Sequence, residues 1–197
     1  RQSKNWIDSK IKDLTTVARE SLSYNSAQKS LIRVLQSYVE LLLNHMNTLT
    51  ELQAQIDNKA KLSPAYNLLL SIPGVGELTA ATIISEIGDV LRFSTVKKLV
   101  AFAGLDPSVY ESGKFKSSHN KISKRGSTHL RKALYQAASA GIRKSKGSPN
   151  NIVLYNYYIK KINEGKLHKV ATVATAHKLL RIIYGIWKKG ELFREDY

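Results

Sequence analysis

Apolar residues recur at every third or fourth position through the first 60 residues of this chain, and this spacing restricts the fold most. They are Ile7, Ile11, Leu14, Ala18 and Leu22, then, after a break at Tyr24-Asn25-Ser26, Leu31, Leu35, Tyr38, Leu42, Leu49, Leu52 and Ile56. Such intervals place apolar side chains on one face of an α-helix. The second series predicts a helix from about Ala27 to Ala60, too long for a compact bundle. We therefore expect residues 1–62 to form an antiparallel helical hairpin or a coiled coil that pairs chains.

The rest of the chain, residues 63–197, continues the helical pattern in shorter pieces. Ser63 suits a helix cap and Pro64 suits the first helical position, so the pair marks a boundary. The sequence shows no internal repeat and no convincing alternation typical of strands. It predicts an all-α protein, in which a long N-terminal helical hairpin or coiled coil precedes a compact helical domain. The expected helices of that domain cover 66–70, 77–87, 95–103 with Ser94 as N-cap, a helix from the Ser127 cap to Ile142, 152–162 and 169–189.

Two apolar helices flank a Pro73-Gly74-Val75-Gly76 turn within residues 66–88. The glycines would let the backbone turn tightly and approach a phosphate, while N–H groups at the next helix start would face the anion. The pattern resembles a helix-hairpin-helix nucleic-acid-binding motif, with Gly74, Val75 and Gly76 at the phosphate. An ordinary corner between helices is the alternative. The extended match from Leu70 through Thr79-Ala80 favours phosphate binding.

A second segment, the basic loop from Gly104 to Gly126, is rich in lysine and almost free of aliphatic runs. Gly104 and Pro107 break the preceding helix, and Gly126 closes the loop before the next one. A long loop without structure of its own is either functional or disordered. Its middle carries Ser112-Gly113, surrounded by Lys114, Lys116, Lys121, Lys124 and Arg125. A serine presented among cations suits chemistry on phosphates.

The positive charge of the chain also favours a partner that carries phosphates. The chain has 31 Lys and Arg against 15 Asp and Glu, which gives a formal net charge of +16. The cations cluster on a few segments, including Arg131 and Lys132 on the helix after the basic loop. Clustered positive charge is typical of nucleic-acid binding. A basic protein with scattered lysines remains the alternative.

Several other classes are disfavoured by composition. The absence of cysteine excludes disulfides and thiolate metal sites, and the five histidines include no short-spaced pair, so we expect no metal site and no cofactor in these residues. No apolar run approaches the roughly 18 residues of a membrane span. No signal peptide is recognisable, which predicts a cytoplasmic protein. The chain begins at Arg1 inside a helical pattern, so we expect it to be part of a longer protein.

A series of segments, taken in order, resembles the C-terminal transposase domain of the IS110/IS1111/IS116 insertion-sequence family. The likeness is strongest from about Leu70 to Ala138 and continues more weakly to Phe193. No single motif is diagnostic, but their order and spacing together are specific. The segments are Ser71-Ile72-Pro73-Gly74-Val75-Gly76 with Thr79-Ala80, Glu86-Ile87-Gly88-Asp89, Phe93, Ala103-Gly104-Leu105-Asp106-Pro107, Glu111-Ser112-Gly113, Ile122-Ser123-Lys124-Arg125-Gly126 and Leu130-Arg131-Lys132-Ala133-Leu134.

The resemblance implies a prokaryotic, nucleoid-associated DNA transposase or site-specific recombinase whose serine forms a covalent phosphoserine link to DNA. By its place in the Glu-Ser-Gly motif, that serine is Ser112. The resemblance also implies a structured guide RNA from the element's own ends, and an N-terminal RuvC-like domain whose acidic residues hold Mg²⁺. These residues contain no such domain, so we expect the fragment to be inactive alone. Residues 1–62 would be the coiled coil of a dimer or tetramer.

A serine that attacks a phosphodiester needs exposure, a proton acceptor and cations for the developing charge. Gly113 leaves space around Ser112, and the guanidinium fork of Arg125 matches phosphate oxygens. His119 is a candidate base, but the sequence leaves that role open. Turn formation and hydrogen bonding to phosphate explain the loop's other serines better; these are Ser108, Ser117, Ser118 and Ser123. The alternative function is a non-catalytic module that binds nucleic acid through the helix-hairpin-helix and dimerises, since it explains every basic residue equally well.

Overall fold

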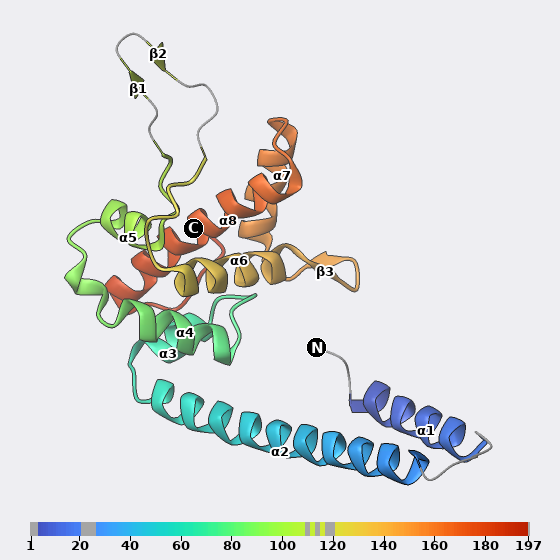
Figure 1. Cartoon of the computed structure of the whole chain (residues 1–197). Coiled ribbons are helices and arrows are strands. Elements are labelled where there is room, and N and C mark those ends of the chain that lie inside the picture. Colours follow the sequence, from blue (N-terminus) through green and yellow to red (C-terminus); the bar gives the residue numbers. More distant parts are fainter. Residues whose placement is uncertain (1–3, 21–26, 109–110, 113–114, 117–120, 197) are drawn as a thin grey trace. The chain divides into compact units, whose positions relative to one another are not determined.

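The computed structural model describes residues 4–20, 27–108, 111–112, 115–116 and 121–196. These residues form eight α-helices, one 3₁₀ turn and two short two-stranded ribbons (Figure 1), which confirms the all-α prediction. The chain divides into two compact units, residues 1–51 and residues 52–197. The division falls inside a helix, so one continuous helix belongs to both units.

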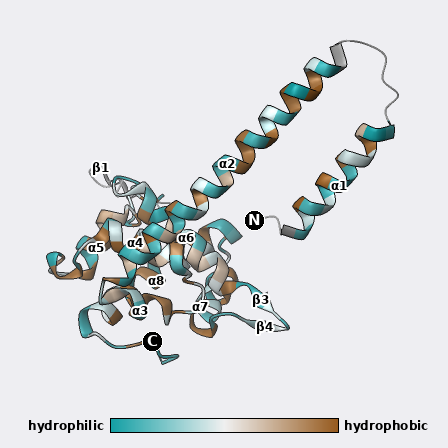
Figure 2. Cartoon of the chain, turned by 90° about the horizontal axis from the view of Figure 1, so that it is seen from below, coloured by the Kyte–Doolittle hydropathy of each residue, from teal (hydrophilic) through white to brown (hydrophobic). Residues whose placement is uncertain are grey.

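The first unit contains helix α1, Lys4–Glu20, and most of helix α2, Ala27–Lys61. Both helices were predicted; the break at Tyr24-Asn25-Ser26 lies outside the described residues. Most of their large apolar side chains are exposed to solvent: Leu35 and Leu42 of α2 are each 60% exposed. Figure 2 shows hydrophobic residues along the length of both helices. The predicted apolar stripe is therefore present and uncovered, and the coiled coil stays a prediction.

A small polar network inside the second unit holds the end of α2, whose residues from Leu52 onward belong to that unit. The Tyr66 hydroxyl donates a hydrogen bond to the Asp57 carboxylate, and Lys61 forms an ion pair with Asp57 at 2.5 Å. The hydrogen bond to Asp57 raises the pKa of Tyr66 to about 12. The pKa of Asp57 is lowered, first by Lys61 and then by Tyr66. Because Tyr66 is buried in helix α3, Ala65–Leu70, the network attaches the last turn of α2 to the core.

The second unit is a helical domain built around its last helix. Helix α8, His168–Lys189, packs against α3, α5, α6 and α7. Apolar side chains at helical spacing meet there because each helix turns its stripe inward. Fully buried members include Leu69, Ile83, Leu99, Leu134, Leu154 and Ile183. The other elements are α4, Glu77–Ile87; the 3₁₀ turn η1, Val90–Arg92; α5, Val96–Ala103; α6, Thr128–Ile142; and α7, Ile152–Asn163.

The predicted helix bounds are confirmed to within a residue or two, but some local predictions are wrong. Thr95, not Ser94, is the N-cap of α5, and Pro64 occupies the N-cap of α3 instead of its first helical position. Ser127 does cap α6, since its Oγ accepts the N–H of Leu130 at 3.0 Å. The turn η1 and both strand ribbons were not predicted. The ribbons are β1–β2, Glu111–Ser112 with Phe115–Lys116, and β3–β4, Lys144–Ser145 with Ser148–Pro149.

Candidate nucleic-acid interface

The turn between α3 and α4 is held against α6 by a glycine pair. Gly74 has a φ of +102°, which L side chains rarely adopt. A Cβ on Gly74 would come within 2.8 Å of the Cα of Gly141 on α6. The side chain of Val75 is buried, and its N–H donates to the carbonyl of Ile72 at 3.0 Å. The side of Gly74 on which a Cβ would project therefore faces α6, and Val75 is buried.

Gly76 has the opposite environment. It is exposed, it stands at the N-cap of α4 without a side-chain hydrogen bond, and a Cβ there would meet no atom within 4 Å. The first N–H groups of a helix have no partner inside the helix and carry its positive end. Glu77 follows in the first turn and brings a carboxylate to the same end. Of the three predicted phosphate contacts, Gly76 is exposed, Gly74 is half-exposed and Val75 is buried.

A buried asparagine attaches this turn to the next helix pair. The Asn151 amide donates to the carbonyl of Pro73 at 3.1 Å, and its oxygen accepts the N–H of Leu154 at 3.0 Å as the cap of α7. The backbone N–H of Asn151 donates to the carbonyl of Gly141 at 2.9 Å. Asn151 is only 2% exposed. Asn before an apolar helix is a capping signal in the sequence, but its bond to a residue 78 positions earlier is not.

A groove runs between the turn and α6. On the turn side its walls are Gly74, Gly76 and Thr79; on the α6 side they are Tyr135, Gln136, Ser139, Ala140 and Arg143. Hydroxyl, amide and guanidinium groups, together with the open backbone at Gly76, give this groove several hydrogen-bond donors. Phosphates are bound in proteins by the same kinds of donor. Sequence reasoning did not assign Arg143 to the site.

The basic loop begins and ends as an antiparallel ladder. Ser108 N–H donates to the carbonyl of Lys121 at 2.7 Å, and Ser123 N–H donates to the carbonyl of Asp106 at 2.8 Å. Pro107 and Ile122 form a bridge between these bonds. Farther along, Glu111 pairs with Lys116, and Ser112 pairs with Phe115. The described parts of the loop are thus two antiparallel pairs, one at its base and one formed by β1 and β2, and the loop is here called the arm (Figure 1).

The arm is closed tightly at its base. Ser127 N–H donates to the carbonyl of Phe102 at 2.7 Å, and a Cβ on Gly126 would lie 1.9 Å from that carbonyl oxygen. Gly104 caps α5 with a φ of +64°, and its carbonyl accepts the N–H of Lys124 at 3.1 Å. Gly104 was predicted to break the preceding helix and Gly126 to close the loop; both also let the two ends of the loop approach each other closely.

The candidate nucleophile is placed by its backbone only. Ser112 belongs to β1, and Lys116 belongs to β2. The side chains of Ser112 and Lys116, and residues Gly113, Lys114, Ser117, Ser118 and His119, lie outside the described residues. The Ser108 hydroxyl donates to the carbonyl of Lys121 at 2.7 Å, and the Ser123 hydroxyl donates to Asp106 at 2.5 Å. Both of these hydroxyls stabilise the base of the arm.

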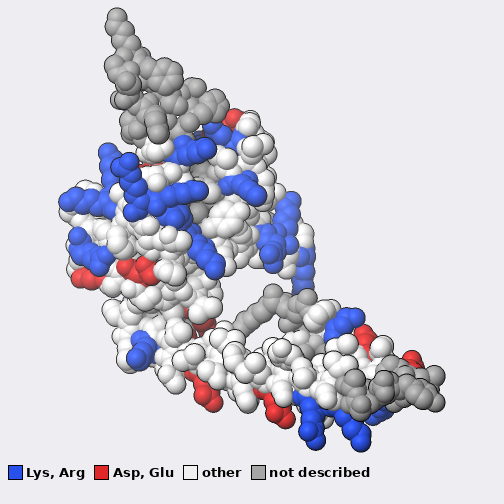
Figure 3. All heavy atoms as spheres, in the orientation of Figure 1, with Lys and Arg blue, Asp and Glu red and all other residues white. Residues whose placement is uncertain are grey.

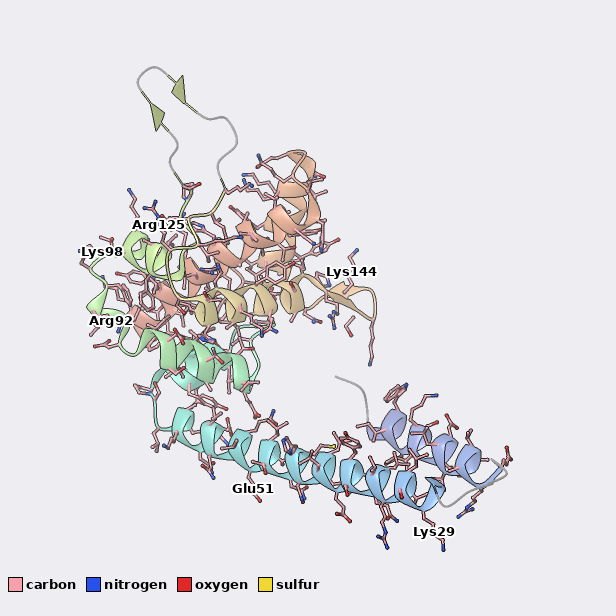
Figure 4. All side chains as sticks on the ribbon, in the orientation of Figure 1. Lys29, Glu51, Arg92, Lys98, Arg125 and Lys144 are labelled. Atoms are coloured by element: carbon pink, nitrogen blue, oxygen red, sulfur yellow. The ribbon has the colours of Figure 1, made fainter. Side chains whose placement is uncertain are left out.

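The predicted cations differ in their surroundings. The Arg131 guanidinium is half-buried and donates to the carbonyl of Ala103 at 3.1 Å and to Thr128 Oγ1 at 3.3 Å. It therefore holds the end of α5 against the start of α6, which leaves fewer of its donors for a phosphate. The other described cations of the predicted set are exposed: Lys121, Lys124, Arg125 and Lys132. Figure 3 shows Lys and Arg outnumbering acidic residues over the visible face of the second unit, and Figure 4 places Arg125 at the foot of the arm.

Two carboxylates in the segments that resemble the family accept hydrogen bonds from other groups of this chain. Glu86 on α4 accepts the Ser127 hydroxyl at 2.6 Å, and Asp89 accepts the N–H of Leu91 at 2.8 Å as the cap of η1. The bond from Ser127 to Glu86 fastens the end of the basic loop to the helix that follows the turn. The turn and the basic loop are therefore parts of one framework.

A half-buried histidine lies beside the foot of the arm. His177 and Arg181 of α8 line a pocket together with Lys97 and Val100 of α5 and with Asp106 and Pro107. Burial lowers the pKa of His177, and the neighbouring Arg181 lowers it further. The imidazole is therefore neutral at neutral pH and can accept or donate a hydrogen bond. Sequence reasoning assigned no role to His177.

Two further properties follow from the described part of the chain. Within it, no group of three or more His, Asp or Glu side chains is arranged to hold a metal ion. None of the helices in the same residues is long and apolar enough to cross a membrane.

Comparison with known proteins identifies the segment that contains both the turn and the basic loop. The profile of the family described as "Transposase IS116/IS110/IS902 family" matches residues 66–152. The transposase for insertion sequence element IS1111A of Coxiella burnetii is 33% identical over 162 residues, which are 82% of this chain and 43% of that protein. The pilin gene-inverting protein of Moraxella bovis is 28% identical over 181 residues, 89% of this chain and 54% of that protein.

A further relative is an uncharacterized 43.6 kDa protein of insertion element IS110 from Streptomyces coelicolor. It is 29% identical over 143 residues, 72% of this chain and 33% of that protein. The chain spans about half or less of the length of these curated relatives. The resemblance read from the sequence is confirmed: through residues 66–152, the chain belongs to the IS116/IS110/IS902 family of transposases.

Proposed function

We propose that this chain is the part of an insertion-sequence transposase that binds DNA and supplies the serine nucleophile, Ser112, for strand exchange. The observation that supports the proposal is the pairing of β1, which contains Ser112, with β2, inside a loop whose two ends are held together by backbone hydrogen bonds. A nucleophile must be held in position while it remains accessible to DNA. A loop with a fixed foot would allow both conditions.

The proposed chemistry is a transesterification. The Ser112 Oγ attacks a DNA phosphorus, a bond from Oγ to phosphorus forms, and the bond from phosphorus to a sugar oxygen breaks. The serine proton passes to a base, and the departing sugar oxygen takes up a proton. Because the phosphate remains a diester, the reaction can be reversed onto another strand. Lys121, Lys124 and Arg125 are exposed cations that would neutralise phosphate charge near the arm.

The proposal includes partners and parts beyond these residues. A structured guide RNA would select the DNA sites, and a RuvC-like domain elsewhere in the whole protein would hold Mg²⁺ through acidic side chains. Residues 1–62 would join chains into a dimer or tetramer. The exposed apolar stripe of α2 supports that assembly, because an apolar face of this length is normally covered by a partner.

The test traps the covalent intermediate in the whole protein with its RNA and a nicked DNA substrate. The proposal expects a DNA adduct on the peptide that contains Ser112, identified by mass spectrometry, and no adduct with Ser112→Ala. DNA binding should survive in that variant, because the phosphate contacts come from cations and backbone N–H groups. An adduct on another serine would refute the residue. Recombination by Ser112→Ala without any adduct would refute the mechanism.

A binding module without chemistry is the second candidate, and the open backbone at Gly76 beside the groove favours it. It would bind nucleic acid through the turn and dimerise through residues 1–62. This function requires salt-sensitive binding that is indifferent to Ser112, and it yields no adduct under any condition.

A further inference from the structure

The structure has a second basic projection, formed by residues 143–149 and here named the basic wing. Strand β3, Lys144–Ser145, pairs with β4, Ser148–Pro149, around Lys146-Gly147. Arg143, Lys144 and Lys146 are all exposed. The segment contains no acidic residue, and no ion pair found in the described part of the chain involves these three cations. Three close cations repel one another, so an anionic partner would stabilise them.

The basic wing is held in place by hydrogen bonds at its foot. Asn150 donates from its backbone to the carbonyl of Arg143 at 3.0 Å and from its side chain to the carbonyl of Ala140 at 2.9 Å. The ammonium of Lys144 lies over the ring of Tyr155, 5.1 Å from the centroid. The wing therefore presents its charges in a defined direction from the end of α6.

The wing is continuous with the groove beside the turn. Arg143, the first residue of the wing, also lines that groove with Gly76 and Gln136. Asn151, which follows the wing, donates to the carbonyl of Pro73 in the turn. The turn, the groove and the wing thus form a connected surface rich in hydrogen-bond donors and cations, with the Glu77 carboxylate exposed at the start of α4.

Helix α6 relates this surface to the basic loop. It begins after Ser127 at the foot of the arm and ends where the wing begins (Figure 1). In Figure 4, Arg125 and Lys144 lie near opposite ends of α6. Its 15 residues span roughly 22 Å at about 1.5 Å per residue. That length corresponds to about six or seven base pairs at roughly 3.4 Å per step.

We propose that the basic wing binds the phosphate backbone of duplex DNA, as a contact separate from the basic loop and about six or seven base pairs away from it. The choice of DNA rests on the proposed function, because the family relatives are transposases and a gene-inverting protein. Contacts to phosphates carry no sequence information. The wing would therefore fix the register of the duplex while other groups choose the site.

The experiment compares the whole protein with the variant Arg143→Gln, Lys144→Gln, Lys146→Gln. The control variant removes the same charge at exposed sites away from the wing, as Lys166→Gln, Lys169→Gln, Lys189→Gln. Binding to a duplex of about 20 base pairs, roughly three times the span of α6, is measured by fluorescence anisotropy at several salt concentrations. Thermal unfolding of each variant verifies that it folds.

In the wing variant, the plot of log K for DNA binding against log salt should become less steep, by about 3, one for each cation removed. Each phosphate contact contributes about −0.9 to that slope. If the two proteins bind DNA equally at about 1 M salt, the wing variant should bind about 10²-fold more weakly at about 150 mM salt. The control should change both quantities much less. Equal effects of the two variants, or an unchanged slope in the wing variant, would overturn the proposal. Loss of binding to a structured RNA of equal charge, with DNA binding intact, would assign the wing to RNA instead.

A second measurement remains decisive if the triple variant does not fold. Lysine acylation of the unaltered protein is read by mass spectrometry with and without the duplex, and Lys144 and Lys146 should become protected. Full reactivity of both lysines in the complex would contradict the proposal. The adduct assay on Ser112 separates the two ideas: an adduct with an unprotected wing refutes the wing alone, whereas a protected wing without any adduct refutes only the nucleophile.

Discussion

The backbones of Gly74 and Gly141 are in direct contact, so that a Cβ on Gly74 would lie 2.7 Å from the N of Gly141 and 2.8 Å from its Cα. This contact separates the two glycines of the turn. Gly74 is required by packing and by its positive φ, whereas Gly76 has open space around it. The turn therefore contains one glycine that packing requires, Gly74, and one with free space around it, Gly76.

Gly74→Ala should destabilise the second unit, because the new methyl group strains the backbone and pushes against α6. The expected loss is about 1–3 kcal/mol in the free energy of unfolding, the usual cost of such strain. Chemical denaturation measures it. Unchanged stability would mean that the turn and α6 are not in contact.

Gly76→Asp should leave stability unchanged or slightly higher, since Asp is a favourable N-cap. It should weaken DNA binding, because a carboxylate would stand where a phosphate approaches the helix start. Gly76→Asn is the matched control, with a similar shape and no charge. Equal DNA affinity of the Asp and Asn variants would exclude a phosphate contact at this position.

The exposed stripe on α2 predicts self-association. Leu35→Glu with Leu42→Glu should dissociate a dimer or tetramer, because two charges would be buried in any pairing of the stripe. Light scattering at tens of micromolar, roughly the range where weak assemblies form, gives the mass. Gln36→Glu adds charge to the same helix and serves as the control. A monomeric unaltered protein, or an assembly that survives both Leu replacements, would contradict the expectation.

His177 should make stability depend on pH. Its pKa is lowered in the folded protein, so between that value and the unfolded value near 6.5 the unfolded chain binds more protons. The stabilising contribution is complete above about pH 6.5 and is lost as the pH falls through the folded pKa. Unfolding curves at pH 5 to 8 should show this decline, and His177→Gln should reduce it. An identical pH profile for the variant would assign the decline to other groups.

The Tyr66 hydroxyl should ionise at a higher pH than the hydroxyl of an ordinary tyrosine. Its pKa of about 12 reflects the hydrogen bond to Asp57. Because the folded pKa lies above the unfolded value near 10, the contribution to stability is present below pH 10 and is lost toward pH 12. Absorbance titration at alkaline pH follows phenolate formation, and Asp57→Asn should bring one tyrosine back toward the ordinary range. No difference between the two titration curves would show that the bond is absent.

The sequence predicts a helix well where residues that stop helices stand at both of its ends. Helix α4 spans the predicted 77–87 because Gly76 and Gly88 bound a strong apolar pattern. The arm of the basic loop was not predicted, since pairing of Asp106 with Ser123 depends on hydrogen bonds and leaves no alternation of apolar residues. Arg131 was assigned to nucleic acid from its charge, and only the fold shows its guanidinium at the carbonyl of Ala103.

Helix α6 also fixes the direction of the wing, relative to that of the arm, around the helix axis. Each residue of an α-helix turns the chain by about 100° and advances it by about 1.5 Å. One residue inserted into α6 would swing the wing round to another side of the helix axis, even if the wing and the arm each kept their own shape. Insertions in the wing's own turn, around Gly147, would leave that orientation intact. The number of residues between Ser127 and Arg143 therefore sets whether both projections can reach the same face of one duplex.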